Sequence, residues 1–492
     1  MRAKFISLFL VIVLLCQTVM ASADWPYGEI GCDTTAASGT GVRIAVIDTG
    51  ISTAIISSKR LVQGKNYIDP SGDTEDKVGH GTAVAGILVG VEKQGLRGVA
   101  PDAVLVPLVC ATLGISGKTI SGSSAIWAQA IRDAVDEFGC KVINLSMGTA
   151  TDDDELRSAV AYAEKRGAVI VSSVGNDNAY KPDSIYYPAG YATVLGVAAL
   201  NENGEIAAFS QRNASVALCA PGVNLKVATI RGKTMNAFGT SYATAFVSGA
   251  AALLLSLKQN LKPAAVRRIL SSSAKDFGVA GYDKDSGWGV LQVHTALTFA
   301  KQGVSFRDTA ADSWYFSAVR YVTDCELFSG TSVTTFDPDG AMTRGMFATV
   351  LGRLDESSYG LIADKTPSFS DINSKEYYAK YIAWAQENGI ILGIGGNMFE
   401  SEREITREEM AQILYNYLNY RAKAVKFDIV NNGKFNDRSN VSSWAVNAVD
   451  TIYSYSIING VGNNTFAPQN TGTRAEVAQI LSNFINIGKV VK

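Results

Sequence analysis

Histidine and cysteine are scarce in this chain, which has 2 histidines and 6 cysteines among 492 residues. No two cysteines form a CxxC pair, and a chain of this length can build its core without cross-links. We therefore predict no disulfide framework for the cysteines beyond the N-terminal segment, and we expect most of them to be buried as small apolar side chains. They are Cys32, Cys110, Cys140, Cys219 and Cys325.

Clustered positive charge and long apolar runs are also missing. Lysine and arginine form no stripe, and the formal net charge is −2, so a nucleic-acid partner is not expected. The apolar run Phe5–Leu15 is shorter than the roughly 20 residues that a membrane-spanning helix needs. Two basic residues precede this run and Ala-Ser-Ala follows it, which is typical of a secretory signal over residues 1–23. Removal of the signal takes away two positive charges, so the formal charge becomes −4 and no membrane segment remains.

The region from about Val42 to Leu297 alternates short apolar runs with longer helical patterns. Near-continuous runs of Val, Ile, Leu and Ala separated by helices are typical of parallel strands that are covered on both faces. The pattern predicts an α/β domain with a mostly parallel sheet, and the apolar segment 242–257 predicts a helix buried at its centre. The expected strands are VRIAVID, AVLVPLV, KVINLS, AVIVSSVG, TVLGVAAL and SVALCAPG, and the expected helices include AIWAQAIRDAVDEF and DDELRSAVAYAEKRG.

After about Lys301 the pattern changes, and a unit of roughly 65 residues recurs three times. Each copy opens with an F-x-D segment, at Phe306, Phe369 or Phe435. It continues through an amphipathic helix and a glycine-containing turn, and it ends in a second helix. Repeats of this length usually form helical arrays whose units bury their apolar faces against each other. The three copies therefore predict one helix-rich module.

Three glycine-containing stretches carry an aspartate, a histidine and a serine, which are Asp48 in VRIAVIDTG, His80 in GHGTAVAG and Ser241 in GTSYATA. A serine hydroxyl becomes nucleophilic when a base takes its proton and an anion orients that base. Asp48 follows a predicted strand at the edge of the sheet where sites of open α/β folds form. A turn aspartate, a structural histidine and a helix-capping serine would each explain one residue alone, but their joint occurrence favours a catalytic triad.

Residues 41–297 resemble a subtilisin-type serine protease in the motifs SGTGVRIAVIDTGI, HGTAVAGI, RGVAPDAVL, VINLSMG, VSSVGNDN and GTSYATAFVSGAAALLL. The resemblance implies a three-layer α/β peptidase domain over residues 24–300 that cleaves protein or peptide substrates through an acyl-enzyme. It implies that Asp48 orients the imidazole, that His80 acts as general base and then general acid, and that Ser241 attacks the carbonyl. Asn176 would stabilise the oxyanion together with the Ser241 backbone N–H. This chemistry requires no cofactor.

The same resemblance assigns the walls of the pocket for the residue before the cut bond to two segments. These segments are Ser146, Met147 and Gly148 in one wall and Ser173, Val174 and Gly175 in the other. Extended backbone at these positions would pair with the substrate strand, which implies broad specificity. Asp177, next to Asn176, would lie at the pocket rim and favour a basic or polar residue.

Two departures from the family pattern bear on activity and metal binding. Ala245 and Phe246 stand where the family commonly has proline and histidine, so a catalytically weak or inactive envelope protein with a structural or peptide-binding role is the alternative hypothesis. In the loop 90–98, Lys93 stands where the family's calcium site presents an amide oxygen, and a cation there competes with Ca²⁺. We predict no metal site. His294 lies outside every motif and is expected to be structural.

Residues 304–492 resemble three S-layer homology domains, with boundaries 304–363, 364–430 and 431–492. The resemblance implies attachment to a secondary cell-wall polymer, whose anionic, pyruvate-bearing sugars would need a cationic fork and an aromatic face. The candidate ligand-binding residues are Arg344, Arg407 and Arg474 in the T-R segments, with Trp314, Tyr377 and Trp444 at the aromatic position.

The three copies are not equivalent in sequence. The first has Met346 where the others close on an acid, and the second has Tyr377 in place of tryptophan, so not all three pockets need bind. The opening aspartates (Asp308, Asp371 and Asp437) either cap turns or contact the ligand. The alternative role of the repeats is dimerisation. Together the two halves indicate a secreted serine endopeptidase associated with the cell wall or S-layer.

Overall fold

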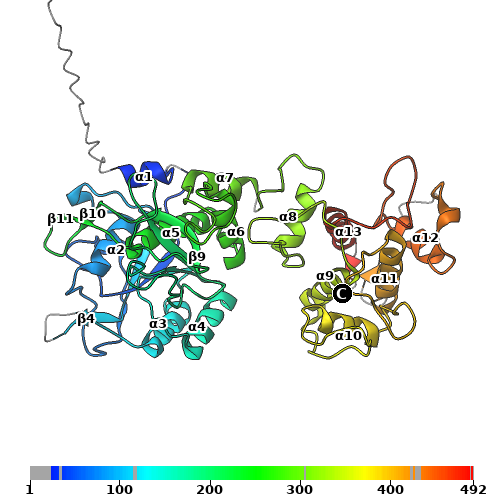
Figure 1. The fold of residues 1–492 in the computed structure, drawn as a ribbon, viewed down its shortest axis with the longest axis horizontal. Helices are drawn as coiled ribbons and strands as arrows, with labels where there is room; N and C mark the ends of the chain where they lie inside the picture. Colours follow the sequence, from blue (N-terminus) through cyan, green and yellow to red (C-terminus); the bar gives the residue numbers. More distant parts are fainter. Residues whose placement is uncertain are drawn as a thin grey trace, which may run out of the picture. The chain divides into compact units, whose positions relative to one another are not determined.

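The structure is a computed structural model that describes residues 24–32, 36–114, 119–303, 306–421, 425–426, 434–487 and 489–490. The signal peptide predicted for residues 1–23 lies outside the described residues. The chain forms two compact units, which Figure 1 shows in blue to green and in green to red. The first unit comprises Met1–Tyr162, Ile170–Ala250 and Gly278–His294, and the second comprises Ala163–Val169, Ala251–Phe277 and Thr295–Lys492.

The first unit is built around a seven-stranded sheet with the strand order β2-β3-β1-β6-β7-β8-β9. The pairs β1–β3, β1–β6, β2–β3, β7–β8 and β8–β9 are all parallel. The strands of the sheet are β1 (Arg43–Asp48), β2 (Lys65–Asn66), β3 (Val104–Val109), β6 (Val142–Leu145), β7 (Val169–Ser173), β8 (Leu195–Leu200) and β9 (Val216–Pro221). Two hairpins flank it, namely β4 (Ala111–Leu113) with β5 (Thr119–Ser121) and β10 (Leu225–Ala228) with β11 (Thr234–Ala237).

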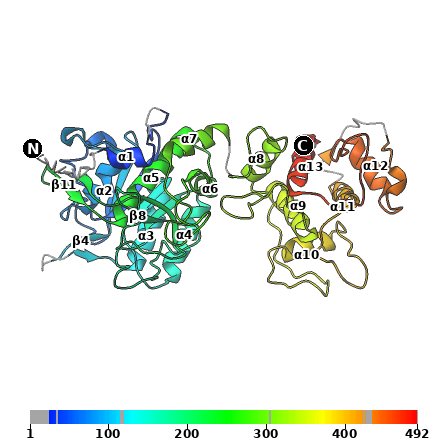
Figure 2. The ribbon, with the colours of Figure 1, turned by 45° about the horizontal axis from the view of Figure 1, so that its top comes forward.

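The sheet strands are buried along almost their whole length because helices cover both faces. Helices α2 (His80–Val89) and α3 (Ser124–Asp136) both contact β1. Helix α4 (Asp154–Lys165) lies beside α3 in the views of Figures 1 and 2, and α1 (Trp25–Glu29) begins the described chain. The six apolar runs expected to be strands are strands, so the predicted α/β class is confirmed.

Helix α5 (Thr240–Leu257) is apolar almost all round and begins two residues earlier than its sequence pattern suggested. By length and composition it could cross a membrane, but 89% of its apolar window is buried inside the protein. It is therefore the core helix that the sequence predicted. Four of the five described cysteines are also buried, whereas Cys325 is exposed.

The second unit contains the three repeats, each with a helix pair. The pairs are α8 (Phe316–Asp324) with α9 (Arg344–Tyr359), α10 (Ala379–Glu387) with α11 (Arg407–Tyr420), and α12 (Val446–Ser454) with α13 (Arg474–Ile487). This unit also holds α6 (Pro263–Ser273), most of α7 (Val293–Gln302) and a two-stranded ladder of β12 (Val425–Lys426) with β13 (Lys489–Val490). The predicted helix-rich module is confirmed.

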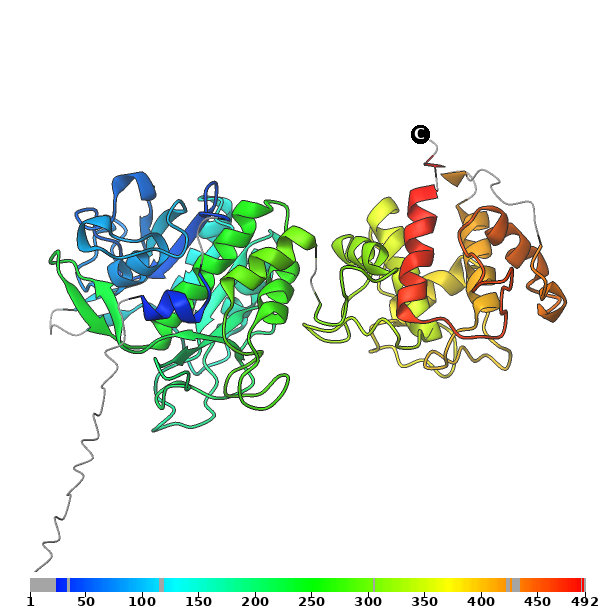
Figure 3. The same ribbon diagram turned by 90° about the horizontal axis from the view of Figure 1, so that it is seen from above.

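The three repeats close into a ring around their T-R segments. Isolated bridges join Ala341 to Thr473, Thr343 to Glu404, and Thr406 to Thr471, so every repeat is bonded to the other two. Helix α13, red in Figure 3, packs against α8 of the first repeat. This closure places residues from all three repeats next to one another.

The aspartate of each F-x-D opening caps a turn in its own repeat. Asp308 accepts hydrogen bonds from the backbone N–H groups of Phe336 and Asp337. Asp371 and Asp437 make the equivalent bonds to Phe399 and Glu400, and to Phe466 and Ala467. Of the two roles left open by the sequence, the structure therefore supports turn capping.

Candidate active site

Asp48 and His80 form the base of the candidate site. Asp48 is the last residue of β1 and is buried, while His80 is the first residue of α2, with 31% of its side chain exposed. Asp48 Oδ1 lies 2.7 Å from His80 Nδ1 and also accepts the Thr49 backbone N–H at 2.8 Å. Burial lowers the pKa of His80, but Asp48 and Asp76 outweigh it, so the pKa stands above its ordinary value of 6.5. The second imidazole nitrogen faces away from the aspartate, as a general base requires.

Asp76 is a functional candidate that the sequence analysis missed. Its buried carboxylate accepts hydrogen bonds from Thr49 Oγ1 (2.9 Å), Thr82 Oγ1 (2.7 Å) and the backbone N–H groups of Val78, Gly79 and Thr82. Thr49 follows β1, and the other donors surround the start of α2. Asp76 thus ties the strand that carries Asp48 to the helix that carries His80. The sequence feature that could have identified Asp76 is its place four residues before His80, the first residue of a helix.

Ser241 lies in the first turn of α5, where backbone N–H groups are free to face a ligand. Its side chain is buried, and its hydroxyl donates to the Ser146 carbonyl at 3.3 Å. The neighbouring Tyr242 ring lies 5.5 Å from the His80 ring, centroid to centroid. Within the described residues we find no hydrogen bond from Ser241 Oγ to His80. Catalytic hydrogen bonds are often long without substrate.

Asn176 is oriented by the residue that precedes the serine. Its Oδ1 accepts from both the backbone N–H and the hydroxyl of Thr240, at 2.8 and 2.9 Å. These bonds assign the amide so that Nδ2 is its free end. Asn176 lines the same groove as Ser241. Thr240 was noticed only as part of the GTS motif, and its orienting role is visible only in the structure.

The groove beside Ser241 has a volume of about 290 Å³. Five of the six predicted wall residues line it, and these are Ser146, Met147, Gly148, Ser173 and Gly175. Val174 is the exception, because alternation along an extended segment turns its side chain into the core, where it is fully buried. Tyr186 is a further lining residue that the sequence analysis did not predict.

Asp177 also lines the groove, where it is held as a carboxylate. Tyr186 Oη donates to it at 2.5 Å and Gln211 Nε2 at 2.8 Å. Burial raises the pKa of Asp177, but these two hydrogen bonds outweigh it and the net shift is downward. The same contact raises the pKa of Tyr186 to about 12. A fixed negative charge therefore stands in the groove near neutral pH.

The departures at Ala245 and Phe246 are accommodated inside the core. Both residues are buried in α5, and Phe246 makes an edge contact with Tyr27 at 5.6 Å between ring centroids. Alanine keeps the helix hydrogen-bonded where proline would not. The helix is continuous from Thr240 to Leu257. His294 is exposed at the start of α7 and is not among the residues that line the groove.

No group of three or more potential metal-ligating side chains is found among the described residues. The loop that carries the exposed Lys93 is closed by backbone hydrogen bonds between Val91 and Leu96. Arg97, at its end, stacks on Tyr27 with 4.7 Å between the guanidinium and the ring centroid. A cation therefore already occupies this part of the loop.

In the second unit, the three predicted ligand arginines are mostly engaged by their own module. All three are buried. Arg344, Arg407 and Arg474 each donate Nε to a phenylalanine carbonyl, those of Phe399, Phe466 and Phe336 respectively. Each guanidinium also lies over the ring of that phenylalanine, at 4.6, 5.2 and 4.7 Å. The arginines are structural as well as candidate binding residues.

Two of these arginines line grooves together with an exposed aromatic side chain. The Arg407 groove, about 220 Å³, includes Trp314, Glu476 and Asn483. The Arg474 groove, about 240 Å³, includes Tyr377, Met346 and Arg353. Trp314, Tyr377 and Trp444 expose 64, 56 and 54% of their surfaces. In each groove the arginine, the aromatic residue and the helix that forms the wall come from three different repeats.

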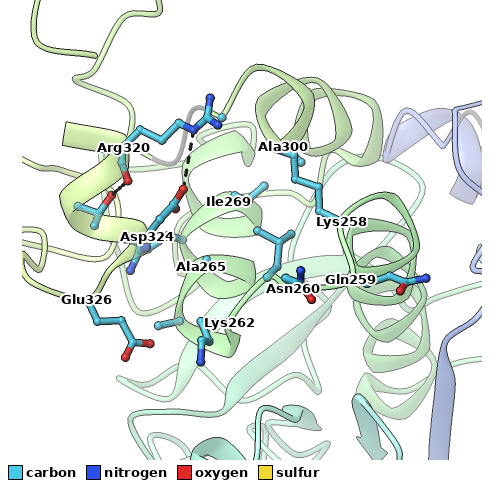
Figure 4. Close-up of a pocket in the computed structure, with 15 residues that line it drawn as sticks. Lys258, Gln259, Asn260, Lys262, Ala265, Ile269, Ala300, Arg320, Asp324 and Glu326 are labelled. Atoms are coloured by element: carbon cyan, nitrogen blue, oxygen red, sulfur yellow. Dashed lines mark hydrogen bonds and ion pairs between the residues drawn. The ribbon is translucent and has the colours of Figure 1, made fainter. Parts of the chain in front are cut away.

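A larger cavity of about 450 Å³ in the second unit lacks this chemistry (Figure 4). It is lined by the segment 258–262, by α6 and by α8, and the Arg320–Asp324 ion pair lies at its edge. Its lining contains no serine, histidine or aromatic residue. We assign no function to it.

Comparison with known proteins gives two family matches. The family model described as "Subtilase family" matches residues 39–289, and that described as "S-layer homology domain" matches residues 305–348, 368–411 and 434–478. The first match contains every residue of the candidate active site. The second recurs in each of the three repeats.

Individual relatives are similar to the first half of the chain. Subtilisin Savinase of Lederbergia lenta is 38% identical over 243 residues, which cover 49% of this chain and 86% of the relative. An alkaline protease of Alkalihalobacillus alcalophilus is also 38% identical, over 49% of this chain and 61% of its own length. The crystal structure of fervidolysin from Fervidobacterium pennivorans, titled a keratinolytic enzyme related to subtilisin, is 30% identical with a TM-score of 0.50. That match covers 56% of this chain and 45% of the fervidolysin chain.

Proposed function

Because the chain belongs to the subtilase family of serine proteases and carries three S-layer homology domains, we propose that it is a cell-wall-attached endopeptidase that works through an acyl-enzyme on Ser241. Family and repeats together indicate an extracellular, cell-surface-associated protease. The proposal also assigns roles to individual residues and names a wall polymer as the ligand of the repeats.

The reaction begins when His80 takes the proton of Ser241 Oγ and the oxygen attacks the peptide carbonyl. Asp48, 2.7 Å from Nδ1, stabilises the imidazolium that results. Asn176 Nδ2 and the Ser241 N–H donate to the oxyanion, and His80 then protonates the leaving amine. Water then attacks the acyl carbonyl while His80 takes a proton from it. His80 returns this proton to Ser241 Oγ as the acyl group leaves. The Asp48–His80 contact is the observation that carries this assignment.

Labelling with a fluorophosphonate tests the nucleophile. We expect one adduct per folded chain, on the tryptic peptide 234–258, and no adduct in Ser241→Ala. Ser248→Ala is the matched control, because Ser248 lies in the same helix and donates to Asn144 Oδ1 inside the core. If Ser241 of the folded wild-type chain were not modified, the assignment would fail, and the inactive envelope protein would be the better hypothesis.

Asp177 supports a preference for a basic residue before the cut bond. Its carboxylate is fixed in the groove, although it is partly exposed and screened, so the effect is modest. We expect Asp177→Asn to lower cleavage after Lys or Arg relative to cleavage after Leu by about threefold to tenfold. A peptide library with one varied position measures this ratio. An unchanged ratio would remove Asp177 from specificity.

The repeats support attachment to a secondary cell-wall polymer. Arginine and an exposed aromatic side chain share a groove at Arg407 and at Arg474, which suits an anionic sugar. The full chain should cosediment with purified Gram-positive walls and lose this binding when the polymer is removed by hydrofluoric acid. Equal pelleting with stripped walls would reject the anchor. Sedimentation velocity without walls separately tests the dimerisation alternative.

A further inference from the structure

The three repeat arginines differ in the acid that faces them. In α11 and α13 the third helical position is glutamate, and these two glutamates approach the arginine of the preceding repeat. Arg344 Nη1 lies 2.9 Å from Glu409 Oε1, and Arg407 Nη1 lies 4.0 Å from Glu476 Oε1. The corresponding position in α9 is Met346, which lines the groove of Arg474. The acid missing from the first repeat is therefore missing from the groove of the third repeat's arginine.

A second position in the same three helices also makes the Arg474 groove more positive. Asn416 and Asn483 donate to the carbonyls of Ile390 and Ile457, at 3.0 and 3.2 Å. Arg353 takes this place in α9 and donates to the Leu327 carbonyl at 3.2 Å. One neutral donor has thus become a cation. With Met346 in place of glutamate, the Arg474 groove is two charges more positive than the Arg407 groove at these positions.

No carboxylate in the described part of the chain forms an ion pair with Arg474, and none lines its groove. The acids that interact with Arg474 from farther away are Asp337, which is exposed, and Asp308, whose oxygens already accept two backbone N–H groups. Arg474 Nε and Nη2 are bonded to the carbonyls of Phe336 and Ser329. The guanidinium is thus held in place while its charge is left uncompensated.

We propose that the Arg474 groove is the principal anion-binding site of the repeat module, and that it takes an acidic sugar whose ring packs on Tyr377. The anion, a carboxylate or a phosphate, would face Arg474 and Arg353. This rests on the wall attachment proposed above and assigns it to one of the two arginine grooves. Met346 and Tyr377, the two departures from the repeat pattern, meet in this groove, so they mark a specialised site.

Electrostatic balance explains why one groove should dominate. A carboxylate that enters the Arg407 groove meets Glu476, which already faces the arginine, and like charges oppose binding. In the Arg474 groove the anion supplies the missing partner of a buried cation. A buried cation without a partner carries a desolvation penalty, and pairing with an anion offsets that penalty. Arg353, Arg474 and Tyr377 line this same groove. Burial and Glu402 raise the pKa of the Tyr377 hydroxyl, and the two arginines lower it by less, so the net shift is upward.

A single substitution can neutralise this groove without harm to the fold. Thr343 Oγ1 accepts the backbone N–H of Met346 at 3.2 Å, which is half of a capping box. In α11 the equivalent Thr406 and Glu409 form both halves. Met346→Glu would therefore complete the helix cap and set a carboxylate opposite Arg474. Met346→Gln makes the same cap without the charge and is the matched control.

The experiment uses the full chain in a Ser241→Ala background, so that it stays intact. Binding is measured to polymer-bearing walls and, by titration, to methyl 4,6-O-(1-carboxyethylidene)-glucoside. Its uncharged 4,6-O-ethylidene analogue and glycerol 3-phosphate are the comparison probes, and they separate a carboxylate ligand from a phosphate. We expect Met346→Glu to weaken binding about tenfold or more and Met346→Gln by less than about threefold. Glu476→Gln, which frees Arg407, should add a second binding site.

The outcomes separate this inference from the anchor itself. If the wild-type chain binds neither walls nor either anion, the attachment proposal fails and the groove assignment fails with it. If the wild-type chain binds and Met346→Glu binds equally well, attachment stands and the assignment to the Arg474 groove is overturned. Loss in both Met346 variants would show that the methionine side chain, and not the charge balance, matters, and would also overturn it.

Discussion

The catalytic groove and the repeat grooves use polar side chains in a similar way but reach different results. In both, most hydrogen-bonding atoms of the key residue are held by the fold and one end is left free. Asn176 has its oxygen held by Thr240 and its nitrogen free, and Arg474 has Nε and Nη2 held by carbonyls. The repeat groove is built from equivalent positions at Arg407 and at Arg474, so these two variants can be compared directly.

The comparison teaches that position alone does not define a site. Arg344, Arg407 and Arg474 all donate Nε to the carbonyl of a phenylalanine whose ring lies beneath the guanidinium, yet only the first two face a glutamate. In the catalytic groove, His80 is likewise defined by its neighbours, because Asp48 and Asp76 raise its pKa against the effect of burial. The binding or catalytic role of such a residue depends on which of its polar atoms remain without a partner once the hydrogen bonds that hold it in the fold are formed.

The largest effect should come from the proposed triad, whose three members would act as a unit. We expect His80→Ala and Ser241→Ala each to lower kcat by about 10⁶-fold, and the double variant to lose hardly more, which is the behaviour measured for subtilisin itself. Peptide hydrolysis at high enzyme concentration measures these rates, with Ser248→Ala as control. Additive losses would contradict a shared mechanism.

The next effect concerns the held and free ends of Asn176. Asn176→Ala removes the free donor and should lower kcat by roughly 10²–10³-fold with little change in KM, again the magnitude known from subtilisin. Thr240→Val removes one of the two bonds that orient the amide and should cost about threefold to tenfold. If both variants changed KM and left kcat intact, Asn176 would be a substrate-binding residue only.

A smaller effect should appear in the pH dependence. The proposed mechanism needs neutral His80, whose pKa is raised, so kcat/KM should fall as the pH drops through that raised value. Asp76→Asn removes one of the charges that raise the pKa, so the acid limb should move to lower pH. Glu92→Gln, a surface carboxylate of the same unit, is the control. An unmoved limb together with a lower melting temperature would make Asp76 structural only.

The smallest effect separates turn capping from ligand binding in the repeats. Burial raises the pKa of Asp371, but the backbone N–H groups of Glu400 and Phe399 outweigh it and the net shift is downward. This contribution to stability is present above the unfolded-state pKa and is lost as the pH falls through the folded-state value. Asp371→Ala should lower the melting temperature by a few degrees and leave wall binding unchanged. Lost wall binding in a folded variant would make Asp371 a ligand contact.

The sequence predicted the fold well because its signals are local and periodic. The strand that ends at Asp48 and the buried helix from Thr240 appear as apolar runs bounded by glycine, and the repeats appear as a recurring F-x-D pattern. Asp48, His80 and Asn176 were found because each stands inside a motif. Val174 was assigned to the groove as part of a segment, and strand alternation removes its side chain from it.

What the sequence missed depends on contacts between distant segments. Asp76 accepts a hydrogen bond from Thr49, which belongs to a different element. Thr240 orients the amide of Asn176, which lies 64 residues away in the sequence. From the sequence of the first repeat alone, Met346 indicates only that the acid of the T-R segment is missing there. Only the closed ring shows that it belongs to the groove of Arg474, which comes from the third repeat.

The central claim is that Ser241 forms an acyl-enzyme, and pre-steady-state kinetics test it most directly. With a p-nitrophenyl ester or activated peptide ester, the account predicts a burst of leaving group equal to one per folded chain, followed by slower turnover. The burst should vanish in Ser241→Ala and persist in Ser248→Ala. Product release without a burst, at a rate that Ser241→Ala shares, would contradict the account.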